Sequence, residues 1–269
     1  MKQSIFIYFF LALTACHSSD SKNAINPKLS TPVKEKIDVE PENILKDFKT
    51  WYEYHYYNIK LAQDFLPKNE NSQKISKSEF LKELNTGKFA AFKTEIVDNV
   101  PSYQLYRIKK VDESMSAVIR QLAQIETDHF NLEGKEIVNY HFTDLNGKKY
   151  SRSSAKGKIV LLKCWFIACK ACVEEFPELN MLVEKYKDHK DIEFISLASD
   201  KALSLDKFLK KKEFKYEVVP EVGAFMTKDL NVTAYPTHFL INRNGHIVKV
   251  SNNIHDILPF LEREISKEL

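Results

Sequence analysis

The sequence has little glycine, proline or cysteine for its length. Its 269 residues include 6 glycines, 9 prolines and 4 cysteines, whereas 43% are hydrophobic and 29% are charged. This composition excludes collagen-like and low-complexity chains and is typical of globular domains. Because the length exceeds that of one average domain, we expect two.

The excess of positive over negative charge is also small. The formal net charge is only +3, and the lysines and arginines do not gather into a basic stripe. Nucleic-acid binding therefore has no electrostatic support, and we expect no nucleic-acid partner. The sequence also contains no internal repeat.

No hydrophobic run is long enough to span a bilayer. A short apolar run, residues 5–13, follows Lys2 and precedes Leu13-Thr14-Ala15-Cys16, as in a signal peptide over residues 1–15. The tetrapeptide resembles a bacterial lipobox, which implies cleavage before Cys16 and a lipid on its thiol. We therefore expect a lipoprotein of the cell envelope that faces the periplasm. An ordinary secretory signal and an uncleaved anchor are the alternatives.

The chain after Cys16 divides into three parts. Residues 16–42 are polar and contain three prolines, which predicts a flexible tether. Residues 43–134 are predicted to form an α+β domain without a recognisable catalytic motif. Its expected elements are helices over 44–66, 76–84 and 114–130, and a hairpin with arms 89–97 and 103–111 around a turn at 98–102. Its aromatic cluster, residues 51–57, is interpreted as packing, with a ligand surface as the alternative.

Residues 135–269 alternate strands and helices and end in a hairpin, which indicates an α/β sheet domain. The segment 159–166 is almost continuously hydrophobic, as in a strand covered on both faces. Expected helices cover 169–187 and 205–214 and start again near 255, and expected strands cover 193–199, 216–219, 237–242 and 246–251.

The three cysteines other than Cys16 lie within nine residues, so they cannot close a long loop, and we expect a chemical role for them. Cys169 and Cys172 are separated by two residues where a strand gives way to a helix. Free N–H groups and the helix dipole at that point favour a thiolate, and Lys170 adds positive charge. We predict that Cys169 is the exposed nucleophile of lowered pKa and that Cys172 resolves the mixed disulfide.

Two other interpretations of this pair lack their usual partners. A zinc site needs a second ligand pair, which would have to come from distant histidines such as His189 and His238. A peroxidase would have a proline and a serine or threonine shortly before the nucleophile, where this chain has Leu162 and Phe166. We therefore expect no metal and no cofactor.

The segment 163–180, which contains the cysteine pair and Pro177, resembles the active site of TlpA/ResA-like thiol-disulfide oxidoreductases of the thioredoxin superfamily. Tyr235-Pro236-Thr237 and the hairpin after it extend the resemblance over about residues 136–269. The resemblance implies a thioredoxin-like fold, a central mixed sheet flanked by helices, with Pro236 cis and against the redox pair. It also implies that Tyr235, Thr237 and Trp165 contact an extended substrate.

The chain departs from the family pattern at three positions. Lys163 stands where thioredoxins have a buried aspartate, so we expect its side chain to reach solvent or pair with an acid, with a desolvated base as the alternative. Cys164 is expected to be an inert core residue on the opposite face of the strand. Ala168 replaces the usual aromatic residue before the nucleophile.

Together these features predict a membrane-anchored enzyme that reduces or exchanges disulfides of exported proteins. Its partners would be protein disulfides or dithiols and an upstream redox partner, and the resemblance implies the reductase direction. One alternative is a thioredoxin-fold binding module or copper metallochaperone without turnover. Another is that the N-terminal domain acts as a lid that restricts substrate choice.

Overall fold

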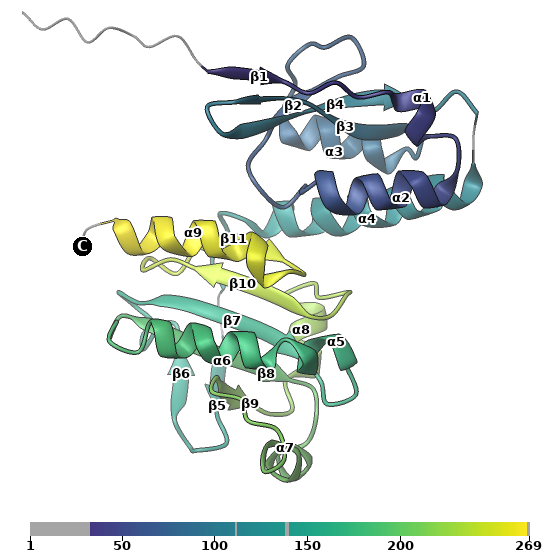
Figure 1. Ribbon diagram of the computed structural model, residues 1–269. Coiled ribbons are helices and arrows are strands. Elements are labelled where there is room, and N and C mark those ends of the chain that lie inside the picture. The colour runs from purple at the N-terminus through teal and green to yellow at the C-terminus, as the bar shows by residue number, and fades with distance from the viewer. Residues whose placement is uncertain (1–32, 111, 138–139, 268–269) are drawn as a thin grey trace, which may run out of the picture. The chain divides into compact units, whose positions relative to one another are not determined.

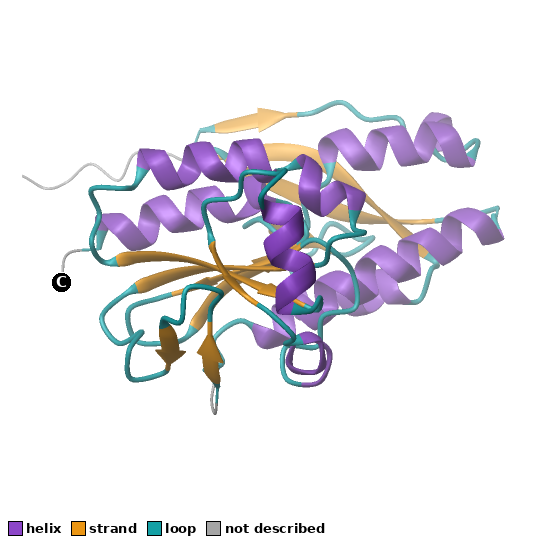
Figure 2. Cartoon of the chain, turned by 90° about the horizontal axis from the view of Figure 1, so that it is seen from below, coloured by secondary structure: helices purple, strands orange, loops and turns teal. Residues whose placement is uncertain are grey.

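The computed structural model describes residues 33–110, 112–137 and 140–267, and the expected lipidation site, Cys16, lies outside them. Two main sheets organise these residues (Figure 1). Figure 2 shows helices lying beside the strands. None of the described helices is both long enough and apolar enough to cross a membrane.

The first sheet has the strand order β1-β3-β4-β2. Its strands are β1 (Lys34–Lys36), β2 (Leu66–Lys68), β3 (Phe89–Val97) and β4 (Val100–Arg107). The expected hairpin of β3 and β4 is present, but its turn is tighter than predicted. Asp98 and Asn99 both have positive φ, 50° and 66°, as in the two-residue turns that match strand twist. Strand β4 therefore begins at Val100 and includes Pro101.

Four helices accompany this sheet, and side chains cap the N-termini of three of them. They are α1 (Pro41–Ile44), α2 (Phe48–Asn58), α3 (Lys77–Asn85) and α4 (Glu113–Leu132). Ser76 and Glu79 form a capping box before α3, and Asp112 caps α4 through its carboxylate. The prediction of a single helix over 44–66 is wrong. Asp47 caps a new helix that starts at Phe48, and Leu66 already belongs to β2.

The predicted tether over 16–42 also extends too far. Lys34–Lys36 pairs with β3 along Glu95–Val97, and α1 starts at Pro41. The three residues of β1 are exposed, and two of them are lysines, which suits the outer strand of a sheet. Short edge strands of this kind carry no hydrophobic alternation, so the sequence pattern does not reveal them.

The second sheet is mixed and has the order β11-β10-β7-β8-β9. Its strands are β7 (Ile159–Trp165), β8 (Ile192–Ala198), β9 (Glu217–Val219), β10 (Thr237–Ile241) and β11 (Ile247–Ser251). Strands β7, β8 and β9 run parallel, whereas β10 is antiparallel to both β7 and β11. All seven residues of β7 are buried, as expected for the central strand.

Helices cover both faces of the second sheet, which has the expected thioredoxin-like fold. They are α5 (Lys170–Glu174), α6 (Phe176–Lys185), α7 (Ala202–Leu209), α8 (Gly223–Lys228) and α9 (Ile254–Ser266). Residues of α6 and α9 share a core cluster with one face of β7, and Met226 of α8 shares one with the other face. A short hairpin of β5 (His141–Thr143) and β6 (Lys149–Ser151) adds to that second cluster.

The helix predicted over 169–187 is interrupted at Glu175, which ends α5 and precedes α6. Pro177 lies in the first turn of α6, where its missing N–H costs nothing. The interruption matters for the site, because it leaves Glu175 at the boundary between the two helices.

Candidate active site

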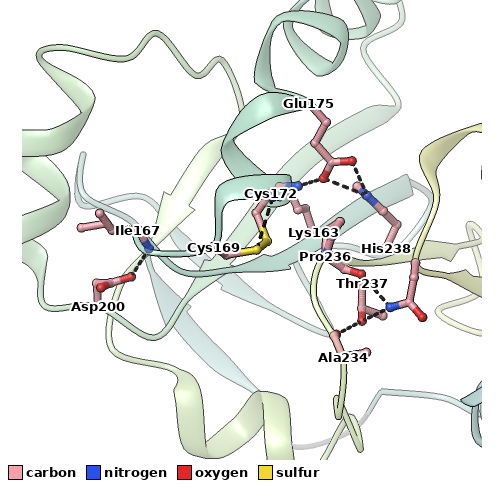
Figure 3. Close-up of a disulfide and its surroundings, with 11 residues drawn as sticks. Lys163, Ile167, Cys169, Cys172, Glu175, Asp200, Ala234, Pro236, Thr237 and His238 are labelled. Carbon is pink, nitrogen blue, oxygen red and sulfur yellow. Dashed lines mark hydrogen bonds and ion pairs between the residues drawn. A yellow bond between two sulfur atoms is a disulfide. The ribbon is translucent and has the colours of Figure 1, made fainter. Parts of the chain in front are cut away.

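Cys169 and Cys172 are joined in a disulfide, with their sulfur atoms 2.02 Å apart (Figure 3). The pair lies between the end of β7 at Trp165 and the first turn of α5. Strand β7 is fixed by β8 and β10 on its two sides, so the loop that carries Cys169 starts from a rigid base. The strand-to-helix junction is where the sequence predicted the pair.

The first cysteine caps helix α5 through its sulfur. The backbone N–H of Cys172 donates to the Sγ atom of Cys169 at 3.2 Å. In the reduced protein the same donor would face a thiolate, which favours the anion. Cys169 is 8% exposed and Cys172 is fully buried. The first cysteine is therefore the more accessible one, but it is much less exposed than predicted, because both belong to a cluster packed around Trp165 and Phe176.

The peptide bond between Tyr235 and Pro236 is cis, as the family resemblance implied. Asn252, from the loop after β11, donates from Nδ2 to the Pro236 carbonyl at 2.6 Å and to Thr237 Oγ1 at 2.9 Å. Thr237 is buried, and its hydroxyl donates to the Ala234 carbonyl at 2.6 Å. The Thr237 side chain therefore supports the loop, and the prediction that it contacts substrate is wrong for the side chain.

Trp165 is likewise unavailable to a substrate in this structure. Its side chain is fully buried and packs edge-on against Phe176 and Phe214, with ring centroids 5.0 and 5.7 Å away. Tyr235 and Phe166, which pack against the cluster of the disulfide, remain partly exposed and meet edge-on at 5.2 Å. Burial raises the pKa of Tyr235, so its hydroxyl stays protonated.

Three ionisable side chains lie to one side of the disulfide: Lys163, Glu175 and His238 (Figure 3). The Lys163 ammonium pairs with Glu175 Oε1, and His238 Nε2 lies 3.2 Å from the same carboxylate oxygen. Lys163 and His238 are fully buried and are register partners on β7 and β10. Burial lowers the pKa of Lys163 to about 7. The predicted pairing of Lys163 with an acid is confirmed and its reaching solvent is wrong. The lowered pKa is what the alternative, a desolvated base, leads one to expect.

Cys164 is fully buried on the opposite face of β7, in a cluster with Leu162 and Phe239, as predicted. Burial raises the pKa of its thiol far above the usual range, which makes it a poor nucleophile. On the loop before the disulfide, the N–H of Ile167 donates to Asp200 Oδ2 at 2.8 Å, which ties that loop to the end of β8.

Comparison with known proteins covers the half of the chain that contains this site. The model of the AhpC/TSA family matches residues 133–250. The thiol-disulfide oxidoreductase ResA of Bacillus subtilis is 30% identical over 139 residues, which are 48% of this chain and 76% of that protein. ResA of Bacillus thuringiensis subsp. konkukian is 38% identical over 117 residues, 43% of this chain and 67% of that protein.

The chain belongs to the family of ResA thiol-disulfide oxidoreductases. Membership of the ResA family makes it an enzyme of thiol-disulfide exchange. Among solved structures, the thioredoxin domain of a thiol-disulfide oxidoreductase from Bacteroides vulgatus is 22% identical with a TM-score of 0.44. That match covers 49% of this chain and 96% of the other. The AhpC/TSA match, residues 133–250, contains the second sheet and not the first.

Sequence reasoning did not place Glu175, His238 or Asn252 beside the cysteine pair, and it considered His238 only as a distant zinc ligand. Glu175 follows Cys172 by three residues, and that spacing places both on one side of a helical turn. His238 follows Pro236 by two residues, so the two share a face of an extended strand. Asn252 carried no such signal, because its place beside the Pro236 loop depends on the return of β11 along β10.

Proposed function

We propose that Cys169 and Cys172 are the redox pair of this oxidoreductase. The observation that supports it is the disulfide at the strand-to-helix junction, with the N–H of Cys172 donating to the Cys169 sulfur. Cys169 is the more accessible sulfur and serves as the nucleophile, and the buried Cys172 resolves the intermediate.

In the reducing direction the Cys169 thiolate attacks one sulfur of a client disulfide and releases the first client thiolate. A mixed disulfide now joins Cys169 to the client. Cys172 then attacks Cys169, the bond to the client breaks, and the second client thiolate leaves. The client gains two electrons, and the enzyme ends with the disulfide that the structure contains.

Insulin reduction tests this pair. We expect Cys169→Ser and Cys172→Ser to abolish turnover with a dithiol reductant, whereas Cys164→Ala, the matched removal of a cysteine from the same segment, retains it. Equal turnover in the wild-type protein and Cys169→Ser would refute the assignment. Stoichiometric copper binding by the reduced protein without any turnover would instead support the metallochaperone reading.

We further propose that the clients are exported proteins and that the enzyme is held at the envelope membrane by a lipid on Cys16. The support is the segment Leu13-Thr14-Ala15-Cys16 after a short apolar run. Metabolic labelling with radioactive palmitate should mark the wild-type protein and not Cys16→Ala. Trapping with Cys172→Ser, which cannot resolve the mixed disulfide, should then identify the clients by mass spectrometry.

We propose that the first sheet and its helices form a separate domain, the one predicted over residues 43–134 with β1 and α1 added at its start. Its buried core cluster contains only residues between Trp51 and Ala123, and the clusters around the second sheet start at Ile137. A core truncation such as Phe80→Ala should therefore lower one calorimetric transition and leave a second one in place. A single transition that shifts as a whole would count against two domains.

A further inference from the structure

A groove of about 260 Å³ lies between helix α2, helix α4 and the loop after β11. Its apolar side chains come from α4 and from the segment that follows α2, and they are Ile59, Leu61, Leu122 and Ile125. Tyr52 and Tyr56 line the groove from α2, and Asn252 and Asn253 line it from the loop after β11. The volume is smaller than that of pockets for drug-sized ligands, about 300–1,000 Å³, and suits one or two side chains.

Helix α2 exposes aromatic side chains that its own packing does not explain. Tyr52, Tyr56 and Tyr57 are 43%, 59% and 74% exposed, whereas Trp51 of the same helix is fully buried. Tyrosine is enriched where proteins bind other proteins, because its ring adds contact area and its hydroxyl stays hydrated. The interpretation of residues 51–57 as packing therefore holds for Trp51, and the exposed tyrosines favour the alternative, a ligand surface.

Hydrogen-bonded contacts fix the two walls of the groove. Gln63, shortly after α2, donates from Nε2 to Asp256 Oδ1 of α9 at 3.2 Å. The buried ammonium of Lys249 on β11 lies 2.7 Å from Glu133 Oε1, just after α4. The groove is therefore formed before any client arrives, which lowers the entropy lost on binding.

The groove borders the loop beside the disulfide. Asn252 lines the groove, and its Nδ2 donates to the Pro236 carbonyl at 2.6 Å. Tyr235, the residue before Pro236, packs against the cluster that contains both cysteines. The Oδ1 atom of Asn252 accepts no hydrogen bond from the described residues, so it can accept one from a backbone N–H of a client.

The ionisable side chains of the groove do not favour a charged ligand. Lys60 donates from Nζ to a backbone carbonyl of α2 at 2.8 Å, and Asp256 accepts hydrogen bonds from two neighbouring side chains. Burial lowers the pKa of His55 to about 4, so its ring is neutral at pH 7. Burial also raises the pKa of Glu126, which favours its neutral form. An apolar side chain fits this lining better than a charged one.

We propose that this groove receives the client polypeptide next to its reacting cysteine, in extended form, with an apolar client side chain against the rings of Tyr52 and Tyr56. The inference rests on the proposed role of Cys169 as the nucleophile and names what the enzyme recognises in its client. The client cysteine lies at Cys169, and the residues beside it extend past Asn252 into the groove. A small disulfide without a flanking chain does not reach the groove.

Synthetic peptides test the chemistry of the occupant. Each peptide carries one cysteine in a disulfide with coloured thionitrobenzoate, and has either leucine or serine at the second and third residues on both sides. Attack by Cys169 releases the colour, and dithiobis-nitrobenzoate is the substrate without a flanking chain. We expect the reduced wild-type protein to react about fivefold or more faster with the leucine peptide. Tyr56→Ala should lower this preference to about twofold or less and leave the rate with dithiobis-nitrobenzoate unchanged.

Tyr57→Ala is the matched control, because Tyr57 follows Tyr56 on α2 and is more exposed but does not line the groove. This variant should keep the full preference for leucine. Equal rates with the two peptides in the wild-type protein, or equal loss of preference in both variants, overturns the groove proposal. Reaction of Cys169→Ser with dithiobis-nitrobenzoate at the wild-type rate overturns the redox-pair assignment instead, so the two failures are distinguishable.

Photo-crosslinking locates the client chain without relying on rates. In Cys172→Ser the leucine peptide stays joined to Cys169, and p-benzoylphenylalanine replaces either Tyr56 or Tyr57. Irradiation should link the peptide to position 56 and not to position 57, as mass spectrometry of the digested protein would show. A mixed disulfide without a link at position 56, or equal links at both positions, contradicts the groove proposal. Absence of the mixed disulfide contradicts the role of Cys169.

Discussion

Asn252 Nδ2 donates to the carbonyl oxygen of Pro236 at 2.6 Å, and this bond joins the end of β11 to the loop beside the disulfide. The same amide reaches the hydroxyl of Thr237. A side chain outside the family motif therefore holds the segment that the motif places next to the cysteines.

Replacement of Asn252 by alanine should destabilise the protein by about 1–3 kcal/mol, because two part-buried hydrogen bonds are lost and their acceptors are left without this donor. Urea unfolding of the oxidised protein measures the change. Asn71→Ala is the control, because Asn71 is exposed and its side chain makes no hydrogen bond within the described residues. Equal stability of the two variants would contradict a supporting role for Asn252.

Tyr235 is expected to contribute to client binding through its partly exposed ring. Tyr235→Ala removes the ring that packs edge-on against Phe166 at 5.2 Å, and such pairs contribute about 0.5–1.5 kcal/mol. The kcat/KM for insulin should fall about twofold to tenfold, with a smaller effect on the rate with dithiobis-nitrobenzoate. Tyr57→Ala, on the exposed side of α2, is the comparison. If the rates with insulin and with dithiobis-nitrobenzoate fell by the same factor, the ring of Tyr235 would support the loop instead of binding the client.

Cys164 should behave as a core residue without redox function. Cys164→Ser places a hydroxyl in a fully buried site and should cost about 1–3 kcal/mol of stability. Activity per folded molecule should remain at the wild-type level. Alkylation by iodoacetamide should be slow in the native protein and fast in urea, because burial raises the pKa of the thiol. Rapid native alkylation at Cys164 would indicate a third reactive thiol.

Lys163 should make stability depend on pH. Burial lowers the pKa of Lys163 in the folded protein to about 7, whereas the same side chain has a pKa of about 10.4 in the unfolded chain. Between these two pKa values the unfolded state binds more protons than the folded state, so the free energy of unfolding should rise with pH, by at most about 1.4 kcal/mol per pH unit. Below pH 7 both states hold the proton, and Lys163 no longer makes stability depend on pH.

Lys163→Met should remove that rise, and Lys190→Met, at an exposed position, should retain it. Urea unfolding of the oxidised proteins at pH 7, 8 and 9 provides the comparison. Parallel stability curves for the wild-type protein and Lys163→Met would contradict a depressed lysine pKa in the folded state.

The sequence predicted the elements of the second sheet well, because β7 is continuously apolar and the segments around it alternate in type. The cysteine pair was found from spacing alone, and the cis bond before Pro236 from the family likeness. Local patterns were sufficient where one element alone decided the outcome, as for the helix predicted over 76–84, which is α3.

The errors share a physical cause. Whether Trp165 and Thr237 face a client or the interior depends on helices and loops that pack over them, which spacing along one strand does not encode. The partner of Lys163 depends on the break between α5 and α6 that turns Glu175 inward. Strand β1 has no apolar alternation and is defined only by its pairing with β3.

The pairing of β1 has a consequence for how far the enzyme can work from a bilayer. If Cys16 carries the lipid, 18 peptide units separate it from Lys34, the first residue of the sheet edge. A fully extended chain of that length reaches about 60 Å. Lys34 would then stay within this distance of the membrane surface, and lengthening the tether with serine and glycine should enlarge the set of proteins captured.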